Sequence, residues 1–221
     1  MSSKFEIILT KLKSNANPQK AVEMKQYMRN RFEFLGIQTP LRRELTKEFF
    51  KEEKKNKVID WAFIWECYRS EYREIHYVAC DYLQAMSKWL EYDNILELYD
   101  LASRHQWWDT IDRLDRIIGN IGLKDKRIDA VMLDWSQSDN FWIRRLAIDH
   151  QIGRKDKTNV PLLKQIILNN LGSDEFFINK AIGWSLREYA KTNPQWVKAF
   201  LDEHQHQLAP LSYREASKHL N

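Results

Sequence analysis

Residues 138–145 (SDNFWIRR) and residues 173–180 (SDEFFINK) repeat one pattern within the chain. Aligning Ser70, Ser103, Ser138 and Ser173 gives intervals of 33, 35 and 35 residues. The alignment produces two buried-type columns, which are Ile75, Trp108, Ile143 and Ile178, and Val78, Ile111, Leu146 and Ala181. The columns lie three residues apart, which is the spacing of an apolar stripe on a helix. The repeat therefore predicts a series of similar helices.

Few residues in this chain break helices. Only six Gly and five Pro occur among 221 residues, and apolar residues recur every three or four positions. This pattern predicts an all-α protein with roughly a dozen helices. Helical pairs that repeat at this length stack into an α-solenoid of HEAT-like repeats with a concave groove. We expect one such domain over residues 1–221.

Several polar residues are typical of helix starts. Such residues accept a hydrogen bond from a free backbone N–H, and a proline that follows favours the first helical position. The predicted starts are Asn17-Pro18, Thr39-Pro40, Ser173-Asp174, Asn193-Pro194 and Ser212. By contrast, Gly119 and Gly122 in the segment GNIG are expected to mark a helix end.

One column of the repeat contains a carboxylate. It consists of Ala79, Asp112, Ala147 and Ile182, and it is otherwise apolar. Asp112 shares a helical face with Trp108 in residues 107–112 (WWDTID). A buried ionised carboxylate needs a partner, so Asp112 either serves a function or pairs with an arginine of an adjacent helix. A shift of one residue in this repeat would exchange Trp107 and Trp108.

Basic residues gather on the predicted second helices of the repeats. Lys180, Trp184, Arg187 and Lys191 are spaced as one helical face, and Arg144 and Arg145 lie on the preceding repeat. Cations interleaved with aromatic rings suit a phosphate backbone and its sugars. The alternative is a solvated face with a packed tryptophan. The net charge of +4 permits a nucleic-acid partner without requiring one.

The remaining composition excludes several classes of protein. Cys67 and Cys80 match no metal or redox motif, which favours a reducing, cytoplasmic setting. The N-terminal residues do not form a signal peptide, and no segment reaches the length of a membrane span. A pair such as His204 and His206 alone is a weak metal signal, so we expect no metal and no cofactor.

The chain resembles the DNA alkylation repair enzymes of the AlkD type, which are HEAT-like repeat DNA glycosylases. The resemblance covers nearly the whole chain. It is carried by residues 17–21 (NPQKA), 34–40 (FLGIQTP), 107–112 (WWDTID), 138–147 (SDNFWIRRLA), 176–191 (FFINKAIGWSLREYAK) and 208–212 (LAPLS).

The resemblance implies roles for individual residues. Asp112 corresponds to the catalytic aspartate, Trp108 and Trp184 to indoles that contact the sugar, and Arg145 to an arginine that grips a phosphate. Arg144 lies beside Arg145, so either guanidinium can fill that last role. The implied DNA contacts nearer the N-terminus are Tyr27, Gln38 and Thr39, and Lys180, Arg187 and Lys191 extend the basic face.

The resemblance also implies a reaction. The expected activity is hydrolysis of the N-glycosidic bond of purines alkylated at N3 or N7, by a monofunctional glycosylase in base excision repair. The expected partner is duplex DNA containing these bases, bound by a monomer in the bacterial cytoplasm and nucleoid. Two alternatives are a non-catalytic protein that binds DNA structures and a HEAT-like protein-interaction scaffold.

Overall fold

The computed structural model describes residues 3–220. The chain forms two compact units, Met1–Leu90 and Glu91–Asn221. Over the described residues it contains thirteen α-helices, and the extended backbone makes a single isolated bridge between Glu33 and Tyr72. The fold is all-α and of the helical-repeat type, as the sequence predicts. A single domain over residues 1–221 stays a prediction.

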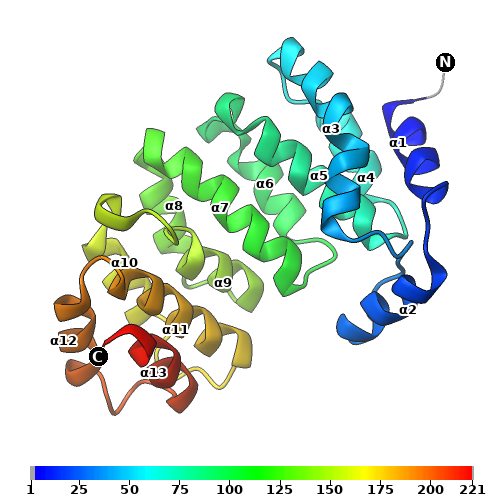
Figure 1. The fold of residues 1–221 in the computed structure, drawn as a ribbon. Coiled ribbons are helices and arrows are strands. Elements are labelled where there is room, and N and C mark those ends of the chain that lie inside the picture. Colours follow the sequence, from blue (N-terminus) through cyan, green and yellow to red (C-terminus); the bar gives the residue numbers. More distant parts are fainter. Residues whose placement is uncertain (1–2, 221) are drawn as a thin grey trace. The chain divides into compact units, whose positions relative to one another are not determined.

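The first unit contains five helices. They are α1 (Lys4–Lys13), α2 (Pro18–Tyr27), α3 (Thr39–Asn56), α4 (Trp61–Tyr68) and α5 (Arg73–Ala85), followed by a 3₁₀ turn at Ser87–Trp89. Helix α5 packs against α3 and α4, and both of these also contact α1 (Figure 1). Ten of the thirteen residues of α5 are buried, which makes this helix the centre of the unit's core.

The second unit contains eight helices. They are α6 (Ile95–Ala102), α7 (Trp108–Lys124), α8 (Arg127–Trp135), α9 (Phe141–Asp149), α10 (Val160–Leu168), α11 (Phe176–Ala190), α12 (Pro194–Glu203) and α13 (Pro210–Ala216). Short 3₁₀ turns lie at Tyr92–Asn94, Lys155–Lys157 and Ser217–His219. Helices α7, α9, α11 and α13 pack in succession, and α8 and α10 pack against them (Figure 1).

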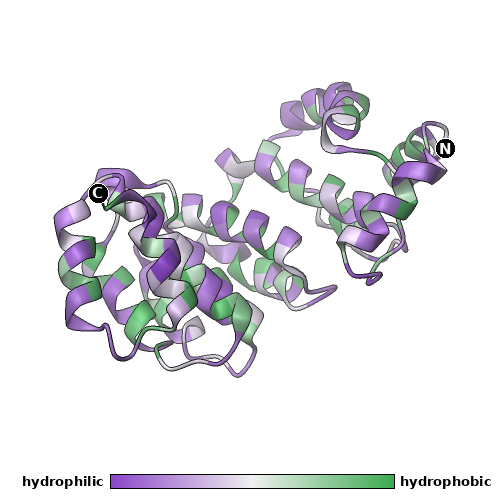
Figure 2. Cartoon of the chain, turned by 60° about the horizontal axis from the view of Figure 1, so that its bottom comes forward, coloured by the Kyte–Doolittle hydropathy of each residue, from purple (hydrophilic) through white to green (hydrophobic). Residues whose placement is uncertain are grey.

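Most helices have two chemically different sides. Hydrophobic and hydrophilic residues alternate around them, as expected when one side packs inside a unit (Figure 2). The predicted columns of the repeat supply this core, since Ile75, Ile143 and Ile178 are fully buried. Within residues 3–220, no helix is both long enough and apolar enough to cross a bilayer.

Two of the five predicted helix starts are correct. Asn17 and Asn193 accept backbone hydrogen bonds at the starts of α2 and α12. The prediction at Thr39 is displaced by one residue, because Thr39 is already the first residue of α3 and Gln38 is the N-cap, without a capping hydrogen bond from its side chain. The prediction at Ser173 is wrong, because α11 begins at Phe176 and is capped by Glu175. The prediction at Ser212 is also wrong. Pro210, with its fixed φ, starts α13 two residues earlier, and the Ser212 hydroxyl donates to the Asn179 carbonyl at 2.8 Å.

The two adjacent tryptophans differ in their surroundings. Trp107 is 4% exposed and its ring lies 5.6 Å from that of Trp142 and 5.2 Å from that of Phe177. Trp108 is only half-buried. Of the two adjacent indoles, Trp107 is therefore the one that packs in the core. Ile111 is also buried, as its column of the repeat predicts.

Gly119 brings two helices unusually close together. The expectation that Gly119 and Gly122 mark a helix end is wrong, because α7 continues to Lys124. A Cβ atom at Gly119 would lie 2.1 Å from the carbonyl oxygen of His150, at the end of α9. The missing side chain therefore allows α7 and α9 to approach closely, beside the carboxylates of Asp115 and Asp149.

Candidate active site

Asp112 on α7 forms an ion pair with Arg145 on α9. The Arg145 guanidinium donates from Nε to Asp112 Oδ1 at 2.8 Å and from Nη2 to Oδ2 at 2.9 Å. Its third nitrogen, Nη1, donates to the backbone carbonyl of Phe177 on α11 at 2.8 Å. One arginine thus joins three successive helices. The alternative that Asp112 pairs with an arginine of an adjacent helix is correct.

The pair lies at the boundary between the interior and solvent. Arg145 is 3% exposed, whereas the side chain of Asp112 keeps 17% of its surface accessible. Burial raises the pKa of Asp112, and the charge of Arg145 acts in the opposite direction. The Asp112 carboxylate is therefore oriented by two hydrogen bonds from buried Arg145, and a molecule in solvent can still reach it.

Two half-buried indoles and a second arginine belong to the same region. Trp108, Asp112 and Arg116 lie at successive turns of one face of α7. Arg116 is exposed, and its guanidinium carbon lies 5.9 Å from the ring centroid of Trp184 on α11. The structure thus connects Trp184 to the face that carries Asp112. Arg116 is not among the residues predicted from the sequence, although its position four residues after Asp112 places it on the same helical face.

The predicted basic face is partly neutralised by one carboxylate. Glu215 on α13 pairs with Lys180 at 3.0 Å and with Arg187 at 2.6 Å. Lys191 pairs with Glu188 at 2.6 Å, and Arg144 donates to the Ser138 carbonyl at 2.7 Å. Glu215 is not among the residues predicted from the sequence, because α13 lies outside the aligned repeats.

The predicted N-terminal contacts all belong to the first unit. Tyr27, the last residue of α2, is 72% exposed. Gln38 is exposed at the start of α3, and the neighbouring Thr39 is half-buried and accepts a hydrogen bond from Arg42 at 3.4 Å. Gln38 and Tyr27 thus present polar groups to solvent, as a DNA contact requires.

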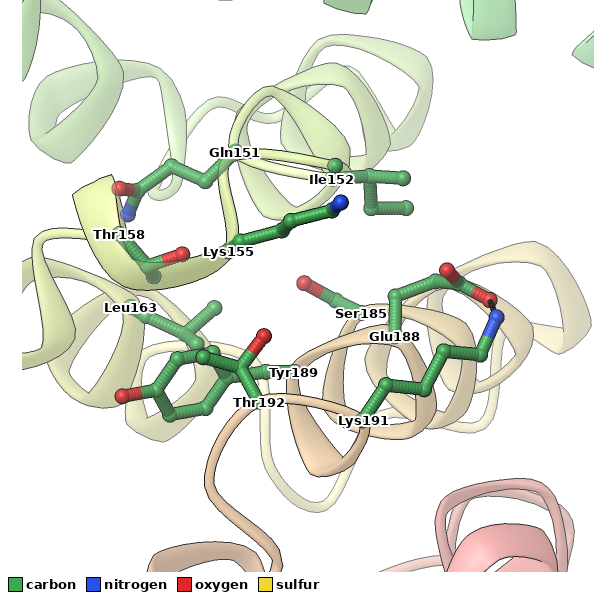
Figure 3. Close-up of a pocket in the computed structure, with 11 residues that line it drawn as sticks. Gln151, Ile152, Lys155, Thr158, Leu163, Ser185, Glu188, Tyr189, Lys191 and Thr192 are labelled. Atoms are coloured by element: carbon green, nitrogen blue, oxygen red, sulfur yellow. Dashed lines mark hydrogen bonds and ion pairs between the residues drawn. The ribbon is translucent and has the colours of Figure 1, made fainter.

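Two further features of the second unit have the form of a site for a small ligand or an ion. A pocket of about 380 Å³ opens between α11 and the segment 151–158, with Lys155, Ser185 and Tyr189 in its wall (Figure 3). Neither Asp112 nor the two predicted indoles line it. Among the described residues, Asp112, Asp115 and Asp149 form a group of carboxylates with oxygen atoms within 4.8 Å of one another.

The chain belongs to the DNA alkylation repair enzyme family, whose model matches residues 8–220. This result confirms the resemblance drawn from the sequence motifs. Comparison with curated proteins gives no match.

Solved structures support the same assignment. A protein described as a predicted DNA alkylation repair enzyme from Enterococcus faecalis is 35% identical, with a TM-score of 0.86, over 93% of this chain and 96% of its own. AlkD2 from Streptococcus mutans is 20% identical, with a TM-score of 0.59, over 78% of this chain and 90% of its own. The smu.31 protein of Streptococcus mutans UA159 is 21% identical, also with a TM-score of 0.59, over 80% and 96%. These two more distant proteins share the fold.

We predict that the adjacent tryptophans contribute unequally to stability. Trp107→Ala should lower the free energy of unfolding by about 3–5 kcal/mol, because it removes a fully packed indole. Trp108→Ala and Trp184→Ala should cost much less, since both indoles are half-buried. Denaturant unfolding of the three variants measures the difference. A loss at Trp184 as large as that at Trp107 would assign Trp184 to the core.

We predict a pH-dependent contribution of Glu215 to stability. The pKa of Glu215 is lowered from 4.5 to about 2. The hydrogen bond from Lys218 is the largest cause; burial opposes it, and the contact with Lys180 lowers the pKa further. A lowered carboxyl pKa stabilises the fold above the ordinary pKa, and this stabilisation disappears as pH falls through the folded-state pKa.

Glu215→Gln should therefore be less stable than the unmodified protein at neutral pH, and the two should converge as pH falls from 4.5 toward 2. Thermal unfolding across this range measures the effect. Glu203→Gln is the control, because Glu203 forms a surface pair with Lys164 and should matter little. A stability difference that is independent of pH would show that Glu215 acts through packing and not through charge.

Proposed function

We propose that this protein is a monofunctional DNA glycosylase that hydrolyses the N-glycosidic bond of purines alkylated at N3 or N7 in duplex DNA. One observation carries the proposal: the partly accessible Asp112 carboxylate receives two hydrogen bonds from buried Arg145 and shares a helical face with Trp108. Family membership supports the same class of substrate.

The proposed reaction needs little more than a fixed negative charge. Alkylation at N3 or N7 makes the purine cationic, so the base leaves with the bonding electrons and no general acid is required. Positive charge then develops on the sugar. A preorganised carboxylate such as Asp112 stabilises that charge and orients the water that attacks the anomeric carbon. A single carboxylate therefore suffices, whereas enzymes that cleave polysaccharides use two.

Arg145 acts on Asp112 in this proposal and does not grip a phosphate. Its exposure of 3% and its three hydrogen bonds leave little surface for DNA. Fixing both carboxylate oxygens limits the rotation of Asp112 and prepares its charge before substrate binds. Arg144, which is half-buried, is the better candidate for a phosphate contact.

The aromatic rings and the remaining cations would hold the DNA. Trp108 and Trp184 offer indole faces to the deoxyribose, where their electron density favours developing positive charge. Lys180, Arg187 and Lys191, together with exposed Arg116, supply charge for phosphates. Tyr27, Gln38 and Thr39 are proposed to contact the duplex from the first unit, and we propose that the protein binds as a monomer without a cofactor.

A specific observation also favours a second candidate function. Both oxygens of Asp112 accept hydrogen bonds from Arg145, so this pair is electrically neutral and serves the fold even without chemistry. A DNA-binding protein that recognises duplex structure and performs no reaction would use the same basic residues. Release of an alkylated base distinguishes the two candidates.

We predict that Asp112→Asn lowers the rate of base release by about 100-fold to 1000-fold, because it removes one preorganised charge from the transition state. Release of 7-methylguanine and 3-methyladenine from methylated DNA is measured by chromatography under single-turnover conditions. Affinity for DNA should hold or rise, because a negative charge near the phosphates is lost.

Asp202→Asn is the matched control, since Asp202 is an exposed aspartate of α12. It should release base at the rate of the unmodified protein. Equal rates for Asp112→Asn and the unmodified protein would exclude Asp112 from the reaction. No release by the unmodified protein would favour the non-catalytic DNA-binding function.

We also predict that the protein binds duplex DNA with a steep dependence on salt and little sequence preference. Each phosphate neutralised by a cation releases counterions, so the affinity falls as salt rises. Removing Arg187 or Lys191 should weaken binding to all sequences about equally and reduce the slope by about one per contact. Fluorescence anisotropy across a salt series measures this slope. Binding that ignores salt would contradict the assignment of these cations.

A further inference from the structure

Two buried carboxyl groups lie directly beneath Asp112. Asp115 is one turn after Asp112 on α7, and Asp149 is one turn after Arg145 on α9. Oxygen atoms of the three carboxyl groups lie within 4.8 Å of one another. Asp115 and Asp149 are each 0% exposed. Asp115 and Asp149, called the inner pair below, therefore lie next to Asp112 but are closed to solvent.

The inner pair has no hydrogen-bond partners among the described residues. Neither oxygen of Asp115 or of Asp149 accepts a hydrogen bond. The shortest ion pair of Asp149 is to Arg145 Nη2 at 3.7 Å, whereas the same guanidinium lies 2.8 Å from Asp112. Arg145 is thus committed to Asp112 and only approaches Asp149.

The local charge does not balance if all three carboxyl groups are ionised. The charged groups that act on the inner pair are Asp112 and Arg116 from α7 and Arg145 from α9. Arg116 is exposed and lies against Trp184, which leaves one buried guanidinium for three carboxyl groups. An ionised carboxylate without a partner is costly in the interior. Burial first, and neighbouring carboxylates second, raise the pKa of Asp115.

A proton fits this cluster better than a metal ion does. A divalent cation is held by several oxygens at about 2.0–2.6 Å, and here both oxygens of Asp112 already accept hydrogen bonds from Arg145. A bound cation would also lie close to the buried positive charge of Arg145. Protonation removes the buried negative charge of the inner pair without this repulsion.

We propose that Asp115 and Asp149 are positioning residues that remain protonated at neutral pH, so that the negative charge of the cluster lies on Asp112 alone. If an inner carboxyl group were ionised, it would attract Arg145, and the two hydrogen bonds that orient Asp112 would weaken. The protonated pair thus decides which carboxylate carries the charge. This role rests on the proposed function, whereas the protonation itself does not.

Carbon-13 NMR of protein labelled at the aspartate carboxyl carbon tests the protonation without DNA. Two carboxyl signals should keep the protonated chemical shift at neutral pH, and Asp115→Asn and Asp149→Asn should each remove one of them. Asp202→Asn, a change at an exposed aspartate of α12, should leave both of these signals in place. If every aspartate of the unmodified protein is ionised at neutral pH, the proposal is wrong. The unmodified protein alone decides this point, even if one variant does not fold.

The pH profile of base release tests the positioning role. In the unmodified protein the rate should fall at alkaline pH, when an inner carboxyl group ionises and competes for Arg145. Asn cannot ionise, so in Asp115→Asn and Asp149→Asn this fall should shift to higher pH. A purely structural role would leave the alkaline limb where it is and would contradict the proposal. If no base is released at all, the glycosylase assignment fails while the NMR result stands.

Addition of Mg²⁺, Mn²⁺ or Ca²⁺ to metal-free protein tests the competing occupant. Thermal unfolding of the unmodified protein should be unaffected by these ions. A rise in melting temperature that Asp115→Asn abolishes would show that the cluster binds a metal ion, and it would overturn the proposal.

Discussion

The guanidinium of Arg145 is the contact on which the second unit depends. It binds the Asp112 carboxylate on α7, extends from α9 and donates to the Phe177 carbonyl at the start of α11. Removing one partner of a buried ion pair leaves an uncompensated charge. The packing of each of these three helices is therefore stabilised by its contact with the others through Arg145. The same arginine fixes the carboxylate that is proposed to stabilise the transition state, which makes stability and chemistry inseparable here.

Carboxylates organise other parts of the molecule in a similar way. In the first unit, buried Glu74 accepts hydrogen bonds from the backbone N–H groups of Leu35, Gly36 and Ile37. In the second unit, Glu215 gathers three cations. In both places one carboxylate accepts hydrogen bonds from several donors that would otherwise need water as an acceptor. The inner acids Asp115 and Asp149 are different, because they have no such donors. This difference is the reason to assign them protons.

The basic residues of α11 have two competing partners. Lys180 and Arg187 now contact Glu215, and a phosphate would have to share these cations with it. Because Glu215 belongs to α13, the last helix of the chain determines the charge that α11 can offer. Among the described residues Arg116 has no ion-pair partner within 4.0 Å, and it lies over the Trp184 ring on the proposed DNA face. Its spacing of four residues from Asp112 would have allowed Arg116 to be predicted as part of the basic DNA-binding face.

The sequence by itself determined the all-α repeat fold and the family, and it singled out Asp112 as a candidate, because helical periodicity and local motifs are properties of neighbouring residues. The tertiary structure alone decided which of Trp107 and Trp108 is buried, since a shift of one residue rotates a helix by a quarter of a turn or more. It also decided that Asp112 pairs with Arg145, that Lys180 and Arg187 share Glu215, and that Asp115 and Asp149 meet. These contacts join helices far apart in the chain, and only packing brings them within the few ångströms over which charges in the interior interact strongly.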